Sequence, residues 1–210
     1  MEETRKKIYC AGPLFTNKER EEMAELASAL ERAEFSTFLP QRDGLELTKC
    51  TDWLVCSGMS QQEAGQLMAC AIFALDMFQV LHGCDALVAN LNGRVPDEGT
   101  VSEAAMAWSR GKPVVGYKAD SRTAFGGQDN PLVAGLFQFK LCHTIDEAVQ
   151  AVDGVLAKGV VSHDCPCRRE EEIRGYTYLG KQIASTLEQR GTVHEIAEVI
   201  RQFASLPVSP

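Results

Sequence analysis

The stretch CDALVANLNGRVPDEGTVSEAAMAWSRGKPVVGY, residues 84–117, contains two short apolar runs on either side of a helix-forming segment. The runs at 86–91 and 113–117 are bounded by Gly, Pro and Asn, a pattern typical of short buried strands. The segment between them, 100–110, predicts a helix rich in small residues. Strands joined by a helix pair in parallel, so this stretch predicts an α/β fold.

The same alternation extends along the chain in both directions. Three further apolar runs predict strands at 7–13, 36–39 and 137–144, and helical periodicity predicts helices at 17–34 and 60–85. Strands this short and apolar belong to a parallel sheet that is covered by helices on both faces. We therefore expect a doubly wound, five-stranded parallel sheet.

The predicted helix at 60–85 has two informative features. It starts at Ser60 with Glu63 three residues later, which is typical of a capping box. Its interior is strongly apolar, so we expect it to be buried on more than one side. Asp76 lies inside that interior, and an unpaired buried carboxylate is costly, so Asp76 either faces solvent or belongs to a polar site.

The character of the chain changes after about residue 145. Strands and helices alternate over 1–145, whereas 146–210 contains two or three amphipathic helical segments and a cysteine-rich turn. We therefore expect an α/β domain at 1–145 followed by a helical C-terminal extension at 146–210.

The eight cysteines are expected to be reduced. Most of them lie in apolar segments, where a thiol serves as a small core residue. In the turn SHDCPCRRE, His163, Cys165 and Cys167 offer soft metal ligands, but they lack the second half of a zinc site. We therefore expect no bound metal and interpret this segment as a turn at Pro166.

Composition and charge limit the possible partners. The chain has 210 residues, 45% of them hydrophobic, and a formal net charge of −8. Its scattered Lys and Arg residues disfavour a nucleic-acid polymer as partner, because phosphate binding needs clustered cations. The N-terminus lacks the apolar run of a signal peptide, and no stretch approaches the roughly 18 to 20 apolar residues of a membrane span. We expect a cytoplasmic protein that binds small molecules and no membrane.

The carboxyl ends of the predicted strands mark the place where a ligand would bind. In doubly wound sheets, ligands bind beyond these ends, where the strand order reverses. The predicted ends are followed by the loops 12–16, 40–44 and 90–99 and by the segment from Lys118 onward. The acidic segment PDEGTVSE lies on this rim.

Two interpretations of Glu103 fit the acidic segment. Thr100 and Glu103 have the spacing of a capping box, which requires no function. Alternatively, Glu103 works with Asp76 and Asp97, because neighbouring carboxylates divide into a protonated acid and an anion, as glycosidic chemistry requires. The two interpretations are compatible, since a helix amino end would keep Glu103 anionic at neutral pH. The sequence contains no P-loop, no G-x-G-x-x-G, no G-x-S-x-G and no H-E-x-x-H motif.

Five segments together resemble the nucleoside 2-deoxyribosyltransferase family. The resemblance implies a flavodoxin-like fold and the transfer of 2-deoxyribose between nucleobases, a reaction of nucleotide salvage, through a covalent deoxyribosyl-glutamate ester. It implies that Glu103 is the nucleophile and that Tyr9 orients it. Asp76 and Asp97 match acidic positions that handle the proton of the leaving base and contact base or sugar. The segments are KIYCAGPLF (7–15), PQRDG (40–44), CDALVANLNG (84–93), PDEGTVSEAAMAWSRGKPVVGYKAD (96–120) and DNPL (129–132).

The resemblance also implies a set of substrate-binding residues. Nucleosides and free nucleobases are the implied ligands, and neither a metal nor an organic cofactor is required. In the family, a loop of a neighbouring subunit completes the pocket with an Asn, which implies a homo-oligomer, a dimer or larger. The loop after the first strand is apolar here, which favours a nucleoside over a nucleotide. The implied substrate-binding residues are Gly12, Phe15, Gln41, Arg42, Asp43, Gly99, Asn130 and Leu132.

The resemblance leaves two other functions open. The first is a nucleoside or nucleoside 5′-monophosphate N-glycosidase, in which water is the acceptor. The second is a non-catalytic nucleotide-sensing protein that uses the C-terminal helices to signal. The combination of Tyr9, Asp76, Asp97 and Glu103 favours an enzyme, since a protein that only binds has no need of so many carboxylates.

Overall fold

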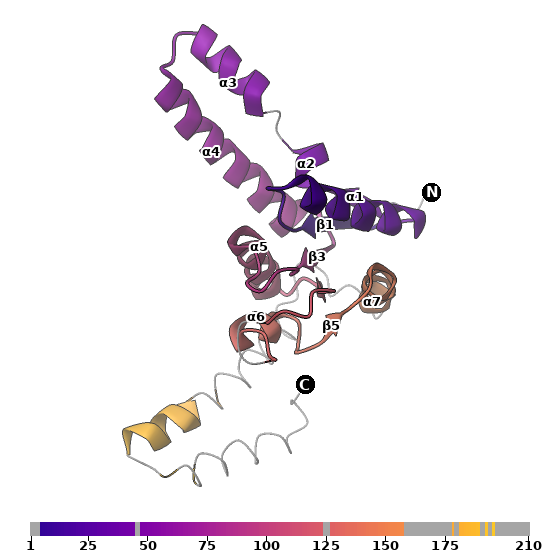
Figure 1. Cartoon of the computed structure of the whole chain (residues 1–210). Coiled ribbons are helices and arrows are strands. Elements are labelled where there is room, and N and C mark those ends of the chain that lie inside the picture. The colour runs from indigo at the N-terminus through magenta and orange to yellow at the C-terminus, as the bar shows by residue number, and fades with distance from the viewer. Residues whose placement is uncertain are drawn as a thin grey trace. The chain divides into compact units, whose positions relative to one another are not determined.

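Five parallel strands form the single sheet of this computed structural model, which describes residues 5–44, 47–123, 127–157, 178, 181–189, 192 and 195 (Figure 1). The strand order is β2-β1-β3-β4-β5, and every neighbouring pair is parallel. The five-stranded, doubly wound sheet predicted from the sequence is therefore confirmed. The strands are β1 (Lys7–Ala11), β2 (Ser36–Phe38), β3 (Ala86–Asn90), β4 (Val114–Tyr117) and β5 (Leu141–Cys142).

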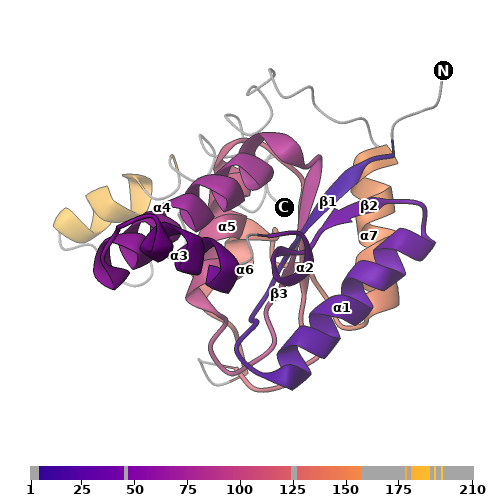
Figure 2. The same ribbon diagram turned by 90° about the horizontal axis from the view of Figure 1, so that it is seen from above.

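Helices cover both faces of the sheet. Figure 2 shows the strands between two helix layers, with α1 and α7 in one layer and α5 and α6 in the other. The strand order reverses direction once, between β1 and β3, and this reversal places helices on both faces, as in flavodoxin-like proteins. The helical segments are α1 (Asn17–Arg32), α2 (Pro40–Asp43), α3 (Leu47–Cys56), α4 (Gln61–Phe78) with the π-helical turn η1 (Gln79–Gly83), α5 (Glu98–Ser109), α6 (Pro131–Leu136) and α7 (Ile145–Ala157).

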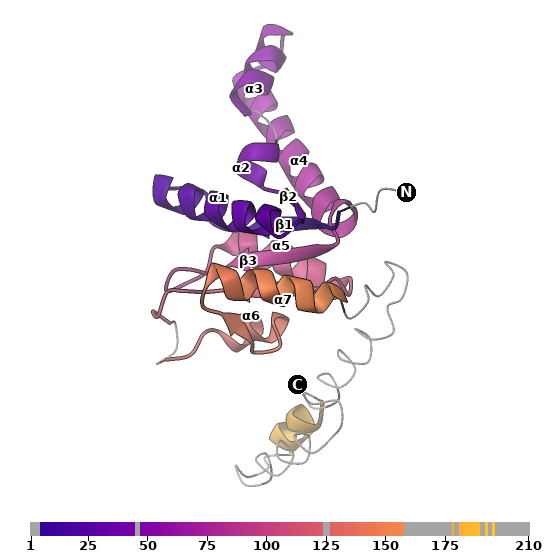
Figure 3. The same ribbon diagram turned by 90° about the vertical axis from the view of Figure 1, so that its right-hand side faces the viewer.

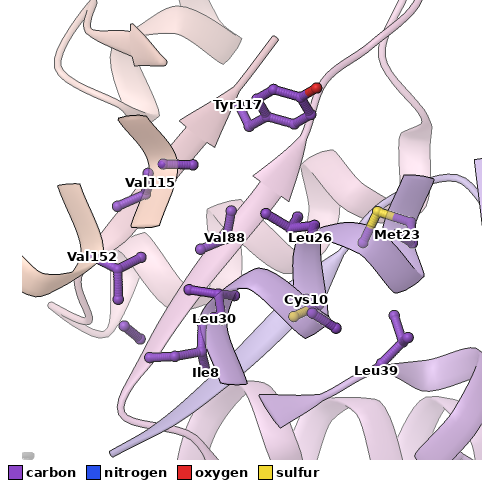
Figure 4. Packing of buried hydrophobic residues seen from close by; sticks show 13 residues of the cluster. Ile8, Cys10, Met23, Leu26, Leu30, Leu39, Val88, Val115, Tyr117 and Val152 are labelled. Carbon is purple, nitrogen blue, oxygen red and sulfur yellow. The ribbon is translucent and has the colours of Figure 1, made fainter. Parts of the chain in front are cut away.

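The residues of β1 alternate between two cores. Ile8 and Cys10 face α1 and α7, where they pack with Leu26 and Val152 (Figures 3 and 4). The intervening Tyr9 faces α5 and η1 on the opposite side of the sheet. Successive side chains of a strand point to opposite faces, and this period of two sends Tyr9 toward the acidic segment.

The helix α4 begins where the sequence predicts but is buried much less than expected. The Ser60 hydroxyl and the Glu63 carboxylate form the predicted capping box. Only Ala64 and Met68 of this helix are buried, so the expectation of burial on more than one side is wrong. The reason is that α4 forms an antiparallel hairpin with α3 that extends away from the sheet (Figure 1).

The α4–η1 segment also corrects an expectation about membrane spans. Among the described residues, Gln61–Gly83 is long and apolar enough to cross a membrane by length and composition, with a mean hydropathy of 1.6 and 17% of that window buried. The single charge of Asp76 does not lower the mean hydropathy of this segment enough to exclude a membrane span. The apolar face of this segment is therefore exposed within the described part of the chain.

The chain divides into two compact units, Met1–Val161 and Ser162–Pro210. The first unit extends beyond the boundary at residue 145 that the sequence suggests, because α7 packs against the sheet and buries Ala148 and Val152. Within the second unit, residues 181–188 are helical. The predicted cysteine-rich turn with His163, Cys165 and Cys167 lies outside the described residues.

Candidate active site

A cavity of about 660 Å³ opens at the carboxyl ends of β1 and β3. The strand order reverses between these two strands, so the cavity lies at the switch point where doubly wound sheets bind ligands. The segment that follows β1, the short helix α2, the C-terminal part of α4 and the start of α5 all contribute to it. The lining residues are Gly12, Leu14, Phe15, Arg20, Pro40, Gln41, Gly44, Ile72, Leu75, Asp76, Asp97, Glu98, Gly99, Thr100 and Glu103.

Tyr9 and Glu103 are joined by a hydrogen bond. The Tyr9 hydroxyl donates to Oε1 of Glu103 over 2.7 Å. The Tyr9 ring is fully buried and stacks on Phe38, with the ring centroids 5.4 Å apart. A rigid ring therefore holds the hydroxyl that orients the Glu103 carboxylate.

Glu103 lies in the second turn of α5, and Asp97 caps the helix. The Asp97 carboxylate accepts hydrogen bonds from the backbone N–H of Thr100, at 2.7 Å, and from its hydroxyl, at 2.9 Å. The predicted capping box of Thr100 and Glu103 is therefore wrong. The helix already starts at Glu98, so the carboxylate of Glu103 is past the free amides and turns to Tyr9 instead.

Burial controls the protonation of Glu103. It raises the pKa of this carboxyl to about 7, and the nearby charges of Asp76 and Asp97 add to the rise, while the hydrogen bond from Tyr9 opposes it. The prediction that helix amides keep Glu103 anionic at neutral pH is thus wrong, since the carboxyl lies past those amides and is desolvated. At neutral pH the carboxyl is divided between its acid and its anion.

Asp76 approaches the same hydroxyl from α4. Burial raises the pKa of Asp76, and the Tyr9 hydroxyl partly offsets the rise. The pKa of Tyr9 itself is raised strongly, first by burial and then by Glu103, so Tyr9 stays a hydrogen-bond donor. Two half-buried carboxyls beside one phenol favour a shared proton, the arrangement needed for combined nucleophilic and acid catalysis.

The substrate-binding candidates divide into two groups. Gly12, Phe15, Gln41 and Gly99 line the cavity together with the acidic residues. The Phe15 side chain is 77% exposed, so it lies at the rim. Packing favours glycine at position 12, because a Cβ there would lie 2.2 Å from the sulfur of Met23.

Arg42 and Asp43 lie outside the residues that line the cavity. The Arg42 guanidinium forms ion pairs with Glu31 and Asp43, each at 2.9 Å, and donates to the Thr37 hydroxyl. The Asp43 carboxylate also accepts a hydrogen bond from the backbone N–H of Leu39 at 2.8 Å. Both side chains thus fix the start of α2, which carries Gln41 to the cavity.

Asn130 and Leu132 also lie outside the cavity lining. The Asn130 side chain caps α6 by accepting from the backbone N–H of Leu132 at 3.0 Å, and the Leu132 side chain is 83% exposed. The preceding residue, Asp129, forms a buried ion pair with Lys118. This pair fixes the segment and leaves Leu132 in solvent within the described chain.

Several cavity residues were not predicted from the sequence. Ile72 lies one helical turn before Asp76, so the periodicity of α4 could have indicated it. Arg20 could not be found in this way, because its place depends on the path of the loop between β1 and α1. Within the described ranges, no group of three or more His, Cys, Asp or Glu side chains is placed to hold a metal ion.

Fold and site together define a flavodoxin-like α/β protein whose switch-point cavity is lined by carboxyl groups. The family model for nucleoside 2-deoxyribosyltransferases matches residues 8–164, so the chain belongs to the nucleoside 2-deoxyribosyltransferase family. This family acts on nucleosides and nucleobases. No curated protein matches the chain.

Several solved structures are similar to this chain at low sequence identity. A conserved protein from Enterococcus faecalis V583 is 22% identical with a TM-score of 0.54, over 72% of this chain and 99% of the other. A 2-deoxyribosyltransferase from Leishmania mexicana is 17% identical with a TM-score of 0.49, over 69% and 95%. A 2-deoxyribosyltransferase from Bacillus psychrosaccharolyticus is 19% identical with a TM-score of 0.46, over 62% and 82%.

Proposed function

We propose that the chain transfers 2-deoxyribose between nucleobases by a double displacement on Glu103. The observation that carries the proposal is the 2.7 Å hydrogen bond from Tyr9 to Glu103 in a cavity that also contains Asp76. A carboxylate that attacks carbon must be ionised, oriented and shielded from water. Tyr9 supplies the orientation, and its hydrogen bond favours the ionised form.

In the first step, a carboxylate oxygen of Glu103 forms a bond to C1′ while the bond from C1′ to the base nitrogen breaks. The electron pair of the broken bond leaves with the base, which takes up the proton held by Asp76. Asp76 suits this role because its raised pKa favours the acid form.

In the second step, a nitrogen of a different base attacks C1′ and displaces Glu103. The incoming base gives its proton to Asp76, so both carboxyls return to their starting state. Two inversions at one carbon give net retention of configuration. When water attacks instead of a base, the product is free deoxyribose.

An assay with one 2′-deoxynucleoside and a second free base tests this proposal. Formation of the new deoxynucleoside is the expected result. Release of free sugar alone would replace the transferase with the N-glycosidase alternative. No turnover of any deoxynucleoside would support the sensing alternative and contradict the proposal.

We further propose that the chain functions as a homo-oligomer. Large apolar side chains on the hairpin of α3 and α4 are exposed, among them Trp53 at 70% and Phe73 at 62%. A second copy of the chain would bury them. Asn130 and Leu132 lie outside the cavity lining of their own chain, which supports a role for them in the pocket of a neighbouring subunit.

A further inference from the structure

The cavity contains one cationic side chain, Arg20, among its lining residues, and this residue is adjacent to Gln41. The Nε2 group of Gln41 donates to the backbone carbonyl of Arg20 over 2.8 Å, which ties α2 to the first turns of α1. The carboxyl groups of the cavity come from α4 and α5 instead. The carboxyl groups and the guanidinium that a ligand would meet thus come from different elements.

Two hydrogen bonds fix the Arg20 guanidinium. Nη1 donates to the carbonyl of Leu14 at 2.8 Å, and Nη2 donates to Oδ1 of Asn17 at 2.5 Å. A guanidinium has five N–H donors and no acceptor, so three have no partner among the described residues and remain for a ligand. Gln41 uses Nε2 on the backbone, which leaves its Oε1 as an acceptor in the cavity that Arg20 also lines.

The chemistry of these groups indicates which part of a nucleoside each one contacts. Sugar hydroxyls donate well to ionised carboxylates, which accept only, and the carboxyl groups of the cavity come from α4 and α5. A guanidinium requires an acceptor, and the strongest neutral acceptors of a nucleoside are the carbonyl oxygens of its base. Gln41 adds an acceptor for a ring N–H next to such a carbonyl.

A phosphate group fits this site poorly. The lining contains Asp76, Asp97, Glu98 and Glu103 against the single cation Arg20. A dianion in the same cavity would be repelled by these carboxylates, and one guanidinium that already has two protein partners does not offset them. A neutral ligand with a carbonyl avoids this repulsion.

We infer that Arg20 and Gln41 select bases that carry a carbonyl beside a ring N–H, such as hypoxanthine, over adenine, which has no carbonyl. The inference rests on the proposed function and names its preferred substrates. When the bond from C1′ to the base breaks, its electron pair spreads over the base onto the carbonyl oxygen. Arg20 beside that oxygen stabilises the negative charge as it develops.

Equilibrium binding of free hypoxanthine and free adenine, by calorimetry, tests the selection separately from catalysis. We expect the wild type to bind hypoxanthine more tightly than adenine. Arg20→Met should weaken the affinity for hypoxanthine by about 10- to 100-fold, the range for a hydrogen bond to a charged group. The affinity for adenine should change less than about threefold. Gln41→Leu, at an exposed position, should weaken the affinity for hypoxanthine by about 3- to 10-fold. Arg32→Met, at the other end of α1, is the matched control and should change neither.

Equal losses for both bases, or no loss, would overturn the inference. Tighter binding of 2′-deoxyinosine 5′-monophosphate than of 2′-deoxyinosine, removed by Arg20→Met, would overturn it in favour of a phosphate site. If the proposed function fails but this inference holds, the protein will bind hypoxanthine selectively and turn over no deoxynucleoside.

Discussion

The Tyr9 hydroxyl and the Oε1 atom of Glu103 are 2.7 Å apart although 94 residues separate them in sequence. β1, an interior strand of the sheet, brings the phenol to this point, and α5 brings the carboxyl from the adjacent helix layer. The position of each side chain is thus set by the element that carries it, β1 for Tyr9 and α5 for Glu103. The distance therefore connects the fold directly to the proposed chemistry.

Tyr9→Phe tests the role of this contact. The substitution removes one oxygen and keeps the buried ring, so the fold should tolerate it. Because the Tyr9 hydrogen bond lowers the pKa of Glu103, its loss should raise that pKa above about 7. The pH profile of kcat/KM should rise with pH as Glu103 ionises, and its midpoint should move to higher pH in the variant. The rate at the plateau should fall about 10- to 100-fold.

Tyr117→Phe is the matched control. The Tyr117 hydroxyl contacts Glu22 at 3.2 Å in the other core of the sheet, away from the residues that line the cavity. Its removal should leave the pH midpoint unchanged. A Tyr9→Phe profile that overlays the wild type would show that the phenol does not control the ionisation of Glu103.

Glu103→Gln should stabilise the fold, and more so at high pH. Burial raises the pKa of Glu103 from 4.5 to about 7, so the folded state binds a proton that the unfolded state releases between these values. The cost of burying this group is absent below pH 4.5, grows up to about pH 7 and is complete above it. Removing the ionisable group should therefore increase the free energy of unfolding by about 2 to 3 kcal/mol at pH 8 and by little at pH 4.

Urea unfolding at the two pH values measures this difference. The Gln carbonyl still accepts from Tyr9, so the hydrogen bond is retained. A destabilised variant at pH 8 would indicate that the Glu103 carboxylate stabilises the fold, as the capping box would have required.

Asp97 combines a structural task with a proposed chemical one, and two substitutions separate them. Asp97→Ala removes the cap of α5 and should cost about 1 kcal/mol of stability, whereas Asp97→Ser keeps a capping oxygen and should cost much less. If the carboxylate also contacts substrate, both variants should lose activity to a similar extent. Thermal unfolding and kcat/KM measured in parallel test this. Full activity in Asp97→Ser would limit Asp97 to the capping role.

Phe73→Lys should disrupt the proposed oligomer. This side chain is 62% exposed on α4, and a charge there would be costly to bury against a second copy. Sedimentation velocity should show a smaller species than for the wild type. Ala33→Lys, at the exposed end of α1, should sediment as the wild type does. An unchanged Phe73→Lys species would exclude this face as the contact.

The sequence predicts the sheet well because its strands are short, apolar and punctuated by Gly, Pro and Asn. It predicts helix starts well where one cap is available, as at Ser60. It fails at α5, where Asp97 and Thr100 are both plausible caps, because the helix starts at Glu98 and Asp97 is therefore the cap. It also fails on the burial of α4, because the apolar pattern of a helix does not show whether other elements of the same chain cover it.

The candidate site was predictable in part from the resemblance to a family and in part from local chemistry. Asp76 could be singled out because an unpaired carboxylate is costly to bury in an apolar helix. The pKa of Glu103 could not be predicted, since it depends on how deeply the carboxyl is buried between elements far apart in sequence. The place of Arg42 outside the cavity depends on its ion pair with Glu31, which no local pattern indicates.

Detection of the proposed covalent ester on Glu103 tests the proposed mechanism most directly. The enzyme is mixed with a 2′-deoxynucleoside, quenched in acid, digested and examined by mass spectrometry. We expect the peptide that contains Glu103 to gain the mass of one deoxyribosyl group, and this gain to disappear when an acceptor base is added before the quench. Deoxyribosyl transfer with the added mass on another residue, or with none at all in wild type and in a slow variant such as Tyr9→Phe, would contradict Glu103 as the nucleophile.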